Sequence, residues 1–133
     1  MFRCLLNWLA MNKVYRKLLR NLDLTYPQYL VTLVLWERDQ VNVSEIGKQP
    51  FLDSATLTPL LKRMETAKLI TRVRAADDDR DVIITLTPKS RDLKQRAKHV
   101  PHAVLCAPEC TPAELVALTG QLDLLRMKLM RNA

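Results

Sequence analysis

The chain has 133 residues, of which 48% are hydrophobic and 26% charged, a composition typical of one folded domain and too short for separate catalytic and regulatory domains. Its formal net charge of +7 favours an anionic partner, with nucleic acid as the first candidate and a membrane surface as the second. The apolar runs fall far short of the roughly 20 residues that a membrane span needs. The first residues lack a signal-peptide cleavage site, so we expect a cytoplasmic protein without a membrane segment. Three cysteines, an odd number, indicate free or redox-active thiols rather than a disulfide framework.

The first part of the chain predicts three helices in succession. Apolar residues near helical spacing predict an amphipathic helix over about residues 4–22. Thr25 and Pro27 are typical of a helix start, and they predict a second helix to about residue 38 that is apolar nearly all round and therefore central. A short helix over residues 44–49 follows, with Ser44 as its N-cap, and Pro50 ends it.

The next segment completes a helix-turn-helix motif. Asp53 and Ser54 offer a second N-cap, and the helix that follows is predicted to reach about Ala67. Its apolar positions recur at i, i+3, i+4 and i+7, and they are Leu57, Leu60, Leu61 and Met64. Two short capped helices joined by a tight turn form a helix-turn-helix. Pro59 is a local conflict, because it leaves the carbonyl of Ala55 without its usual donor and favours a bend.

The remaining elements are a hairpin and two further helices. Two β-prone runs, 69–74 and 82–87, flank the polar stretch 75–81, which we interpret as the tip of a wing. A basic helix is predicted from residue 88 to about 100, where Pro101 stops it, and Thr111 and Pro112 begin the last helix. In that helix leucines spaced 3-4-3-4 indicate a seam that meets another helix; they are Leu115, Leu118, Leu122, Leu125 and Leu129.

This order of elements predicts an α+β, mostly helical fold: a winged helix-turn-helix with N- and C-terminal dimerisation helices. We expect a single domain over residues 1–133. Within it, the DNA-binding winged helix takes about residues 26–100, and the dimerisation helices take about residues 4–22 and 111–131.

Several polar residues of the motif are placed to meet double-stranded DNA. On the second helix of the motif, those expected to reach base edges or phosphates are Ser54, Thr56, Thr58, Lys62 and Arg63. Arg80, at the wing tip, is placed to enter the narrow minor groove. Its acidic neighbours, including Asp78, repel phosphate, and we interpret some of them as groups that orient arginines and cap the turn. The alternative, that Lys62 and Arg63 only solvate a surface helix, stays open.

The sequence offers little for catalysis. His99 and His102 have no metal-spaced partner, and Cys106 and Cys110 lack a second ligand pair. There is no glycine-rich phosphate loop, nucleophile elbow or Ser/His/Asp set. We therefore expect no enzyme, no metal site and no cofactor.

Four segments resemble the MarR family of transcription regulators and, within it, the organic-hydroperoxide-sensing branch. They are LTYPQYL at 24–30, VLWE at 34–37, LDSATLTPLLKR at 52–63 and the wing residues DDR at 78–80, within a similarity that runs from about residue 1 to 125. The resemblance implies a homodimeric repressor, a palindromic operator, and release when an organic hydroperoxide oxidises a cysteine. It places the wing Asp-x-Arg pattern on Asp78 and Arg80. The tyrosines that hydrogen-bond the sensor thiolate fall on Tyr15 and Tyr26, with Tyr29 as the associated third.

The sensor cysteine itself is where this sequence departs from the family. The family's position aligns with Met1, and Cys4 lies three residues later, about one helical turn along on nearly the same face. The second cysteine of two-cysteine members falls on Cys106. Three interpretations remain: Cys4 has taken over sensing and pairs with Cys106 of the other subunit, the regulator does not sense peroxide, or the natural chain starts elsewhere. In the second of these, Cys4 is a small apolar packing residue.

Two other functions compete with the redox repressor. One is a MarR-like repressor released by a small amphipathic or phenolic ligand, which binds between the dimer helices and the DNA-binding lobes. The other is a thiol peroxidase or an interaction module.

Overall fold

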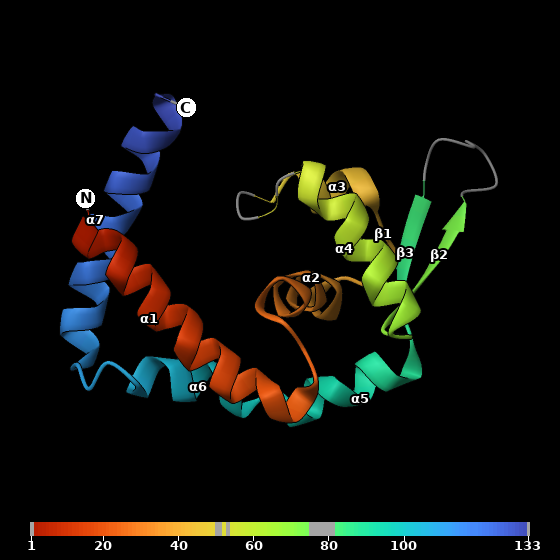
Figure 1. Ribbon diagram of the computed structural model, residues 1–133, viewed down its shortest axis with the longest axis horizontal. Coiled ribbons are helices and arrows are strands. Elements are labelled where there is room, and N and C mark those ends of the chain that lie inside the picture. Colours follow the sequence, from red (N-terminus) through yellow and green to blue (C-terminus); the bar gives the residue numbers. More distant parts are fainter. Residues whose placement is uncertain (1, 50–51, 53, 75–81, 133) are drawn as a thin grey trace.

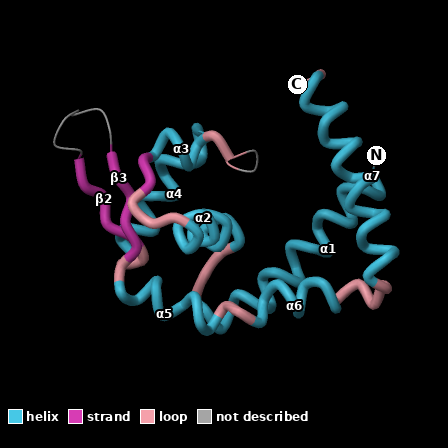
Figure 2. Tube along the Cα trace, turned by 180° about the vertical axis from the view of Figure 1, so that it is seen from behind, coloured by secondary structure: helices cyan, strands magenta, loops and turns pink. Residues whose placement is uncertain are grey.

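The structure, a computed structural model, describes residues 2–49, 52, 54–74 and 82–132 (Figure 1). Its elements in chain order are α1 (Phe2–Leu19), the 3-10 helix η1 (Arg20–Leu22), α2 (Tyr26–Glu37), β1 (Val41–Asn42), α3 (Val43–Gly47), α4 (Ser54–Thr66), β2 (Ile70–Arg74), β3 (Val82–Leu86), α5 (Pro88–Arg96), α6 (His99–Cys106) and α7 (Pro112–Arg131). A lobe holds α2, α3, α4 and the sheet, and an arm formed by α1, α6 and α7 projects from it (Figures 1 and 2). The expected winged-helix fold is confirmed.

Helix α2 forms the centre of the lobe, as its apolar sequence predicts. It begins with a capping box, in which the backbone N–H of Thr25 donates to Gln28 Oε1 (2.9 Å) and the N–H of Gln28 donates to Thr25 Oγ1 (3.5 Å). Pro27 occupies the first turn, where a missing N–H costs nothing. Val31 and Leu35 are almost fully buried, so the helix is fixed by packing as well as by its cap.

The sheet has three antiparallel strands in the order β1-β3-β2. The hairpin pairs Ile70 with Leu86 and Arg74 with Val82, which confirms the two predicted wing strands. The short strand β1, whose Val41 pairs with Ile84, was not predicted because two residues carry no readable alternation. Residues 75–81 of the predicted wing tip lie outside the described residues.

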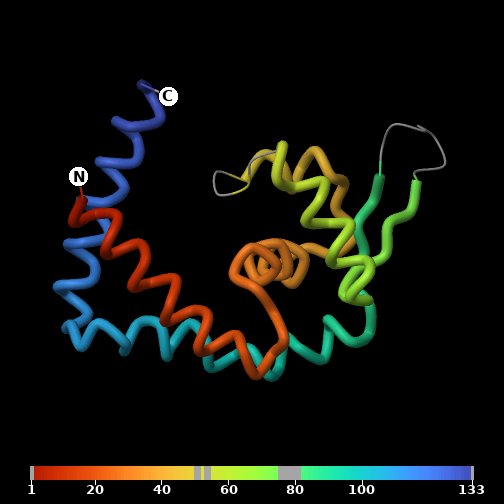
Figure 3. Tube along the Cα trace, in the orientation of Figure 1, coloured from red at the N-terminus to blue at the C-terminus, as the bar shows by residue number. Residues whose placement is uncertain are grey.

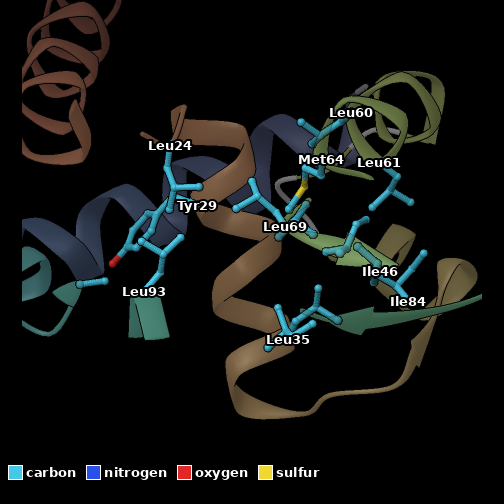
Figure 4. Close-up of a cluster of buried hydrophobic side chains, with 14 of the residues drawn as sticks. Leu24, Tyr29, Leu35, Ile46, Leu60, Leu61, Met64, Leu69, Ile84 and Leu93 are labelled. Carbon is cyan, nitrogen blue, oxygen red and sulfur yellow. The ribbon is translucent and has the colours of Figure 1, made fainter. Parts of the chain in front are cut away.

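The core lies between α2, α4, the sheet and α5 (Figure 4). From α4 it takes the four predicted apolar positions, Leu57, Leu60, Leu61 and Met64, each at most 2% exposed. Burying one such side chain fully stabilises the fold by about 1.5–3 kcal/mol. The helix continues through Pro59, which is exposed, so the predicted helix holds despite the proline.

The prediction that one helix runs from residue 88 and stops at Pro101 is wrong. Helix α5 ends at Arg96, and α6 begins at His99, so that Pro101 sits inside its first turn. Pro101 has no N–H to donate to the carbonyl of Ala97. The N–H of Val100 donates to that carbonyl instead (3.0 Å). This bond joins residues three apart, so the turn is tighter than an α-helical turn, and α5 ends before it.

Two helix starts also differ from the prediction. The short helix of the motif, α3, is capped by Asn42 rather than by Ser44, because Asn42 Oδ1 accepts from the N–H of Glu45 (2.8 Å) and from the hydroxyl of Ser44 (2.8 Å). Helix α1 begins at Phe2, before the predicted residue 4.

Candidate nucleic-acid interface and redox residues

Helix α4 presents one buried face and one exposed polar face. Thr56, Thr58, Lys62 and Arg63 are all exposed. None of these four side chains has a hydrogen bond or an ion pair to another residue in the described part of the chain. Ser54 begins the helix, and the position of its side chain is outside what the structure describes. The opposite face is held in the core, so the free polar groups sit on a rigid support that favours binding of an external partner.

The base of the wing adds two cations that the sequence analysis did not single out. Arg72 and Arg74 lie two residues apart on β2, which places them on the same face of the strand. Arg72 lies 3.8 Å from Glu65 of α4, so it links the strand to the helix, whereas Arg74 is exposed. Alternation of arginine along a predicted wing strand was the signal that could have identified them. Asp78 and Arg80 lie outside the described residues.

The three cysteines are free and exposed, and they lie on different elements. Cys4 is near the start of α1, Cys106 is the last residue of α6, and Cys110 is in the connection to α7. Cys106 Sγ lies 3.7 Å from Nδ1 and 3.8 Å from Nε2 of His102.

The three tyrosines form a cluster where α1 meets α2. The ring centroids of Tyr15 and Tyr26 are 4.7 Å apart, and those of Tyr15 and Tyr29 are 6.2 Å apart. Burial raises the pKa of all three hydroxyls; Tyr26 further raises the pKa of Tyr15, and Tyr15 further raises the pKa of Tyr29. They therefore keep their protons at neutral pH, and none has a hydrogen-bond partner among the described residues. The cluster is a set of free O–H donors.

Cys4 does not reach this cluster within one chain. It precedes Tyr15 by eleven residues on the same helix. At 1.5 Å per residue the two are about 16 Å apart along the helix axis. The structure thus brings the tyrosines together and leaves Cys4 and Cys106 on separate elements.

The arm exposes large apolar side chains on two helices. Helix α7 buries no residue, and the exposed fractions of Leu118, Leu122, Leu125 and Leu129 are between 43% and 54%. The first half of α1 exposes Phe2, Leu5 and Trp8 by more than half. Both surfaces lie at the end of the molecule far from the sheet (Figure 3).

A groove of about 950 Å³ runs between the C-terminal half of α1 and the start of α2. Its lining includes four cations, namely Lys13, Arg16 and Lys17 of α1 and Arg20 of η1, and the carboxylate of Asp23. None of the four cations forms an ion pair with another described residue.

Residues 13–97 match the family described as transcriptional regulator SarA/Rot, which covers well over half of the chain. The chain belongs to the SarA/Rot family of MarR-like transcriptional regulators. The resemblance to the organic-hydroperoxide branch is confirmed as well, since a relative in that branch is 50% identical. Members of the SarA/Rot family are named as regulators rather than as enzymes, as expected.

This SarA/Rot regulator is similar to two curated relatives and to one solved structure. The HTH-type transcriptional regulator TtmR of Methylorubrum extorquens is 47% identical over 93% of this chain and 64% of that protein. The organic hydroperoxide resistance transcriptional regulator of Bacillus subtilis is 50% identical over 71% of this chain and 65% of that protein. The structure of reduced AbfR bound to DNA aligns with a TM-score of 0.80 and 31% identity, over 98% of this chain and 89% of that one. The chain thus spans just under two thirds of the length of these two curated relatives.

Two further features concern the described part of the chain, a possible membrane span and a possible metal site. No helix there is long and apolar enough to cross a membrane. No group of three or more His, Cys, Asp or Glu side chains there is arranged to hold a metal ion.

Proposed function

We propose that this SarA/Rot regulator is a cytoplasmic transcriptional repressor that binds, as a homodimer, an inverted-repeat operator in double-stranded DNA. The observation that carries the proposal is the exposed face of α4, where Thr56, Thr58, Lys62 and Arg63 have no side-chain partner among the described residues. Hydroxyl and cationic groups on such a helix are the groups that read base edges and phosphates in the major groove. The wing lies beside this helix, and its exposed Arg74 supplies a second contact with the DNA.

Homodimerisation is supported by the exposed surface of the single chain. A compact monomer of its mass, 15.3 kDa, exposes about 7,100 Å². This chain exposes 10060 Å². The excess, about 2,900 Å², is larger than the roughly 800 Å² per partner of a standard interface, and it fits an obligate dimer.

The DNA-binding proposal is tested by titrating a labelled inverted-repeat operator at several salt concentrations. Lys62→Ala should weaken binding to all sequences and lower the salt slope by about one unit, as expected for the loss of one phosphate contact. Arg80→Ala should weaken operator binding strongly if the arginine enters the minor groove. Lys98→Ala, which removes an exposed charge between α5 and α6, is the matched control. Operator binding that is unchanged in both Lys62→Ala and Arg80→Ala would contradict the proposed interface.

Within this function we propose release by oxidation, in which Cys4 of one subunit forms a disulfide with Cys106 of the other. The Bacillus relative's name indicates response to organic hydroperoxide. In this chain, the tyrosine hydroxyls are donors without an acceptor among the described residues, and Cys4 lies too far along α1 to supply one from the same chain. A thiolate from the second subunit would accept hydrogen bonds from Tyr15 and Tyr26. A thiolate attacks the peroxide, and the resulting sulfenic acid condenses with a second thiol.

A non-reducing gel after stoichiometric cumene hydroperoxide tests the redox proposal. The parent protein should form a covalent dimer that is absent in Cys4→Ser and in Cys106→Ser. Loss of operator binding should accompany the covalent dimer, and reductant should restore it. A parent protein that stays monomeric on the gel and keeps its operator would refute sensing by Cys4.

The basic groove favours a second candidate, release by an anionic amphipathic ligand. Four cations that form no ion pair with another described residue, beside the apolar side chains of Leu24 and Pro27, match a carboxylate on an aromatic ring. Benzoate at increasing concentration, with reductant present throughout, should then release the operator from the parent protein and not from Arg16→Ala. Release that requires oxidant and ignores benzoate would exclude this candidate.

A further inference from the structure

A second thiol site lies where α6 ends, away from the tyrosine cluster. Its groups are Cys106, His102 one helical turn earlier, and Cys110 four residues later. All three side chains are exposed, so a reagent from solution can reach them.

The imidazole of His102 is close enough to take the proton of the Cys106 thiol. The sulfur lies 3.7 Å from Nδ1 and 3.8 Å from Nε2. A neutral imidazole leaves one of these nitrogens unprotonated, and since both are near the sulfur, either tautomer offers an acceptor. Proton transfer leaves the thiolate, which is the nucleophilic form of cysteine.

Cys110 follows Cys106 after a short turn of the chain. The N–H of Glu109 donates to the carbonyl of Cys106 (3.1 Å), so residues 106–109 form a turn, and Glu109 has a left-handed φ of 56°. Cys110 follows this turn directly, and its thiol donates to the carbonyl of Pro108 (3.3 Å). The residues between the two cysteines are exposed, so packing in the core does not oppose a rearrangement that brings the two sulfurs together.

We propose that Cys106, activated by His102, reacts with organic hydroperoxides on its own and is then resolved by Cys110 of the same chain. The Cys106 thiolate attacks the outer oxygen of the hydroperoxide, the O–O bond breaks, and the departing alkoxide takes the proton from His102 to leave as an alcohol. The Cys106 sulfenic acid then condenses with the Cys110 thiol, which releases water and forms the disulfide. Two thiols are oxidised to one disulfide, and one hydroperoxide is reduced to an alcohol and water.

The consequence for the fold lies at the start of α7. Cys110 directly precedes Thr111, whose hydroxyl caps that helix by accepting from the N–H of Glu114 (3.3 Å). No residue of α7 is buried, so within the chain its direction depends on this connection. A Cys106–Cys110 disulfide would redirect the helix. This site does not rest on the proposed DNA binding, and it needs no Cys4.

The test uses the full-length chain with Cys4→Ser, so that only this site and no Cys4 chemistry remains. After limiting cumene hydroperoxide and alkylation, cleavage behind Glu109 places Cys106 and Cys110 in separate peptides. Mass spectrometry should find them joined by a disulfide within one chain. Adding Cys110→Ser should instead leave a Cys106 sulfenic acid that dimedone traps.

His102→Gln tests the activation, and His99→Gln is the matched control on the same helix, since His99 Nδ1 faces the carbonyl of Arg96 (2.8 Å) and no thiol. His102→Gln should slow oxidation of Cys106 at neutral pH by about 100-fold, the lower range for a lost general base. Any of three results would overturn the proposal. Cys106 could react no faster than Cys110, the two histidine variants could react at equal rates, or the disulfide could form only between chains. Operator titration is a separate measurement, so either proposal can fail alone.

Discussion

Asp39 shows how much one side chain contributes to the position of the wing. Its Oδ1 accepts from the N–H of Leu86 and of Gln40, and its Oδ2 accepts from the guanidinium of Arg91, each at 2.9 Å. The carboxylate therefore ties the end of α2 to β3 and α5. Burial raises the pKa of Asp39, but these hydrogen bonds and the charge of Arg91 outweigh burial and hold the pKa below its usual value.

We predict that Asp39→Asn destabilises the fold by about 1–3 kcal/mol, the cost of losing hydrogen bonds to a charged group. Because the folded-state pKa lies below that of the unfolded chain, the carboxylate's contribution is fully present above about pH 3.9 and is lost as the pH falls through the folded-state pKa. Urea unfolding between pH 3 and 7 measures both effects. Asp92→Asn, at an exposed carboxylate without a partner among the described residues, is the control. An Asp39→Asn variant with the parent's stability at pH 7 would show that the contacts contribute little.

At the scale of the element, α7 is a well-capped helix that its own chain does not bury. Its capping box is complete, since the N–H of Thr111 donates to Glu114 Oε2 (2.8 Å) and the N–H of Glu114 donates to Thr111 Oγ1 (3.3 Å). Gly120 lies in the interior of the helix, and a Cβ there would meet no atom within 4 Å. Glycine in a helix interior is destabilising by about 0.5–1 kcal/mol relative to alanine.

We therefore predict that Gly120→Ala raises the stability of the protein by about 0.5–1 kcal/mol per chain, because it lowers the backbone freedom of the unfolded state. Thermal unfolding followed by circular dichroism at fixed protein concentration measures this. Gly47→Ala is the comparison, since a Cβ there would lie at an ordinary 3.6 Å from Leu57 Cδ2. A lower midpoint for Gly120→Ala would mean that another chain packs closely against α7 at this residue.

On the scale of the whole molecule, the arm carries the apolar surface on which the proposed dimer rests. The leucines of α7 and the apolar residues of α1 remain exposed in the single chain, and the chain as a whole exposes more surface than a compact monomer of its mass. Folding and association are then expected to be coupled, so the thermal midpoint should rise with protein concentration.

Leu122→Glu should shift the protein to monomers at micromolar concentration, because it places a charge in the proposed apolar seam. Gln121→Glu, one residue away on the same helix, carries the same charge change and should leave the dimer intact. Analytical ultracentrifugation distinguishes them. A dimer that persists in Leu122→Glu would place the interface on another surface.

The fold predicted from the family resemblance is confirmed, but not every prediction about single residues is. Helix α4 was predicted together with its buried face, since Leu57, Leu60, Leu61 and Met64 repeat at helical spacing. The break between α5 and α6 was missed, because the Ala97 carbonyl finds its donor in Val100 before the predicted stop at Pro101. DNA contacts by Lys62 and Arg63, and those of Arg80 outside the described residues, stay predictions.

The sequence by itself determined most of the helices, the two wing strands and the leucine seam of the last helix, because caps, turns and periodicity act between residues a few positions apart. Only the tertiary structure decided which distant groups meet. It placed Tyr15 against Tyr26, and it brought Asp39 to Leu86 and Arg91. It also showed that Cys4 is too far along α1 to serve the tyrosines of its own chain. Such contacts depend on how helices and strands pack, and the pattern of a single segment carries no information about its distant neighbours.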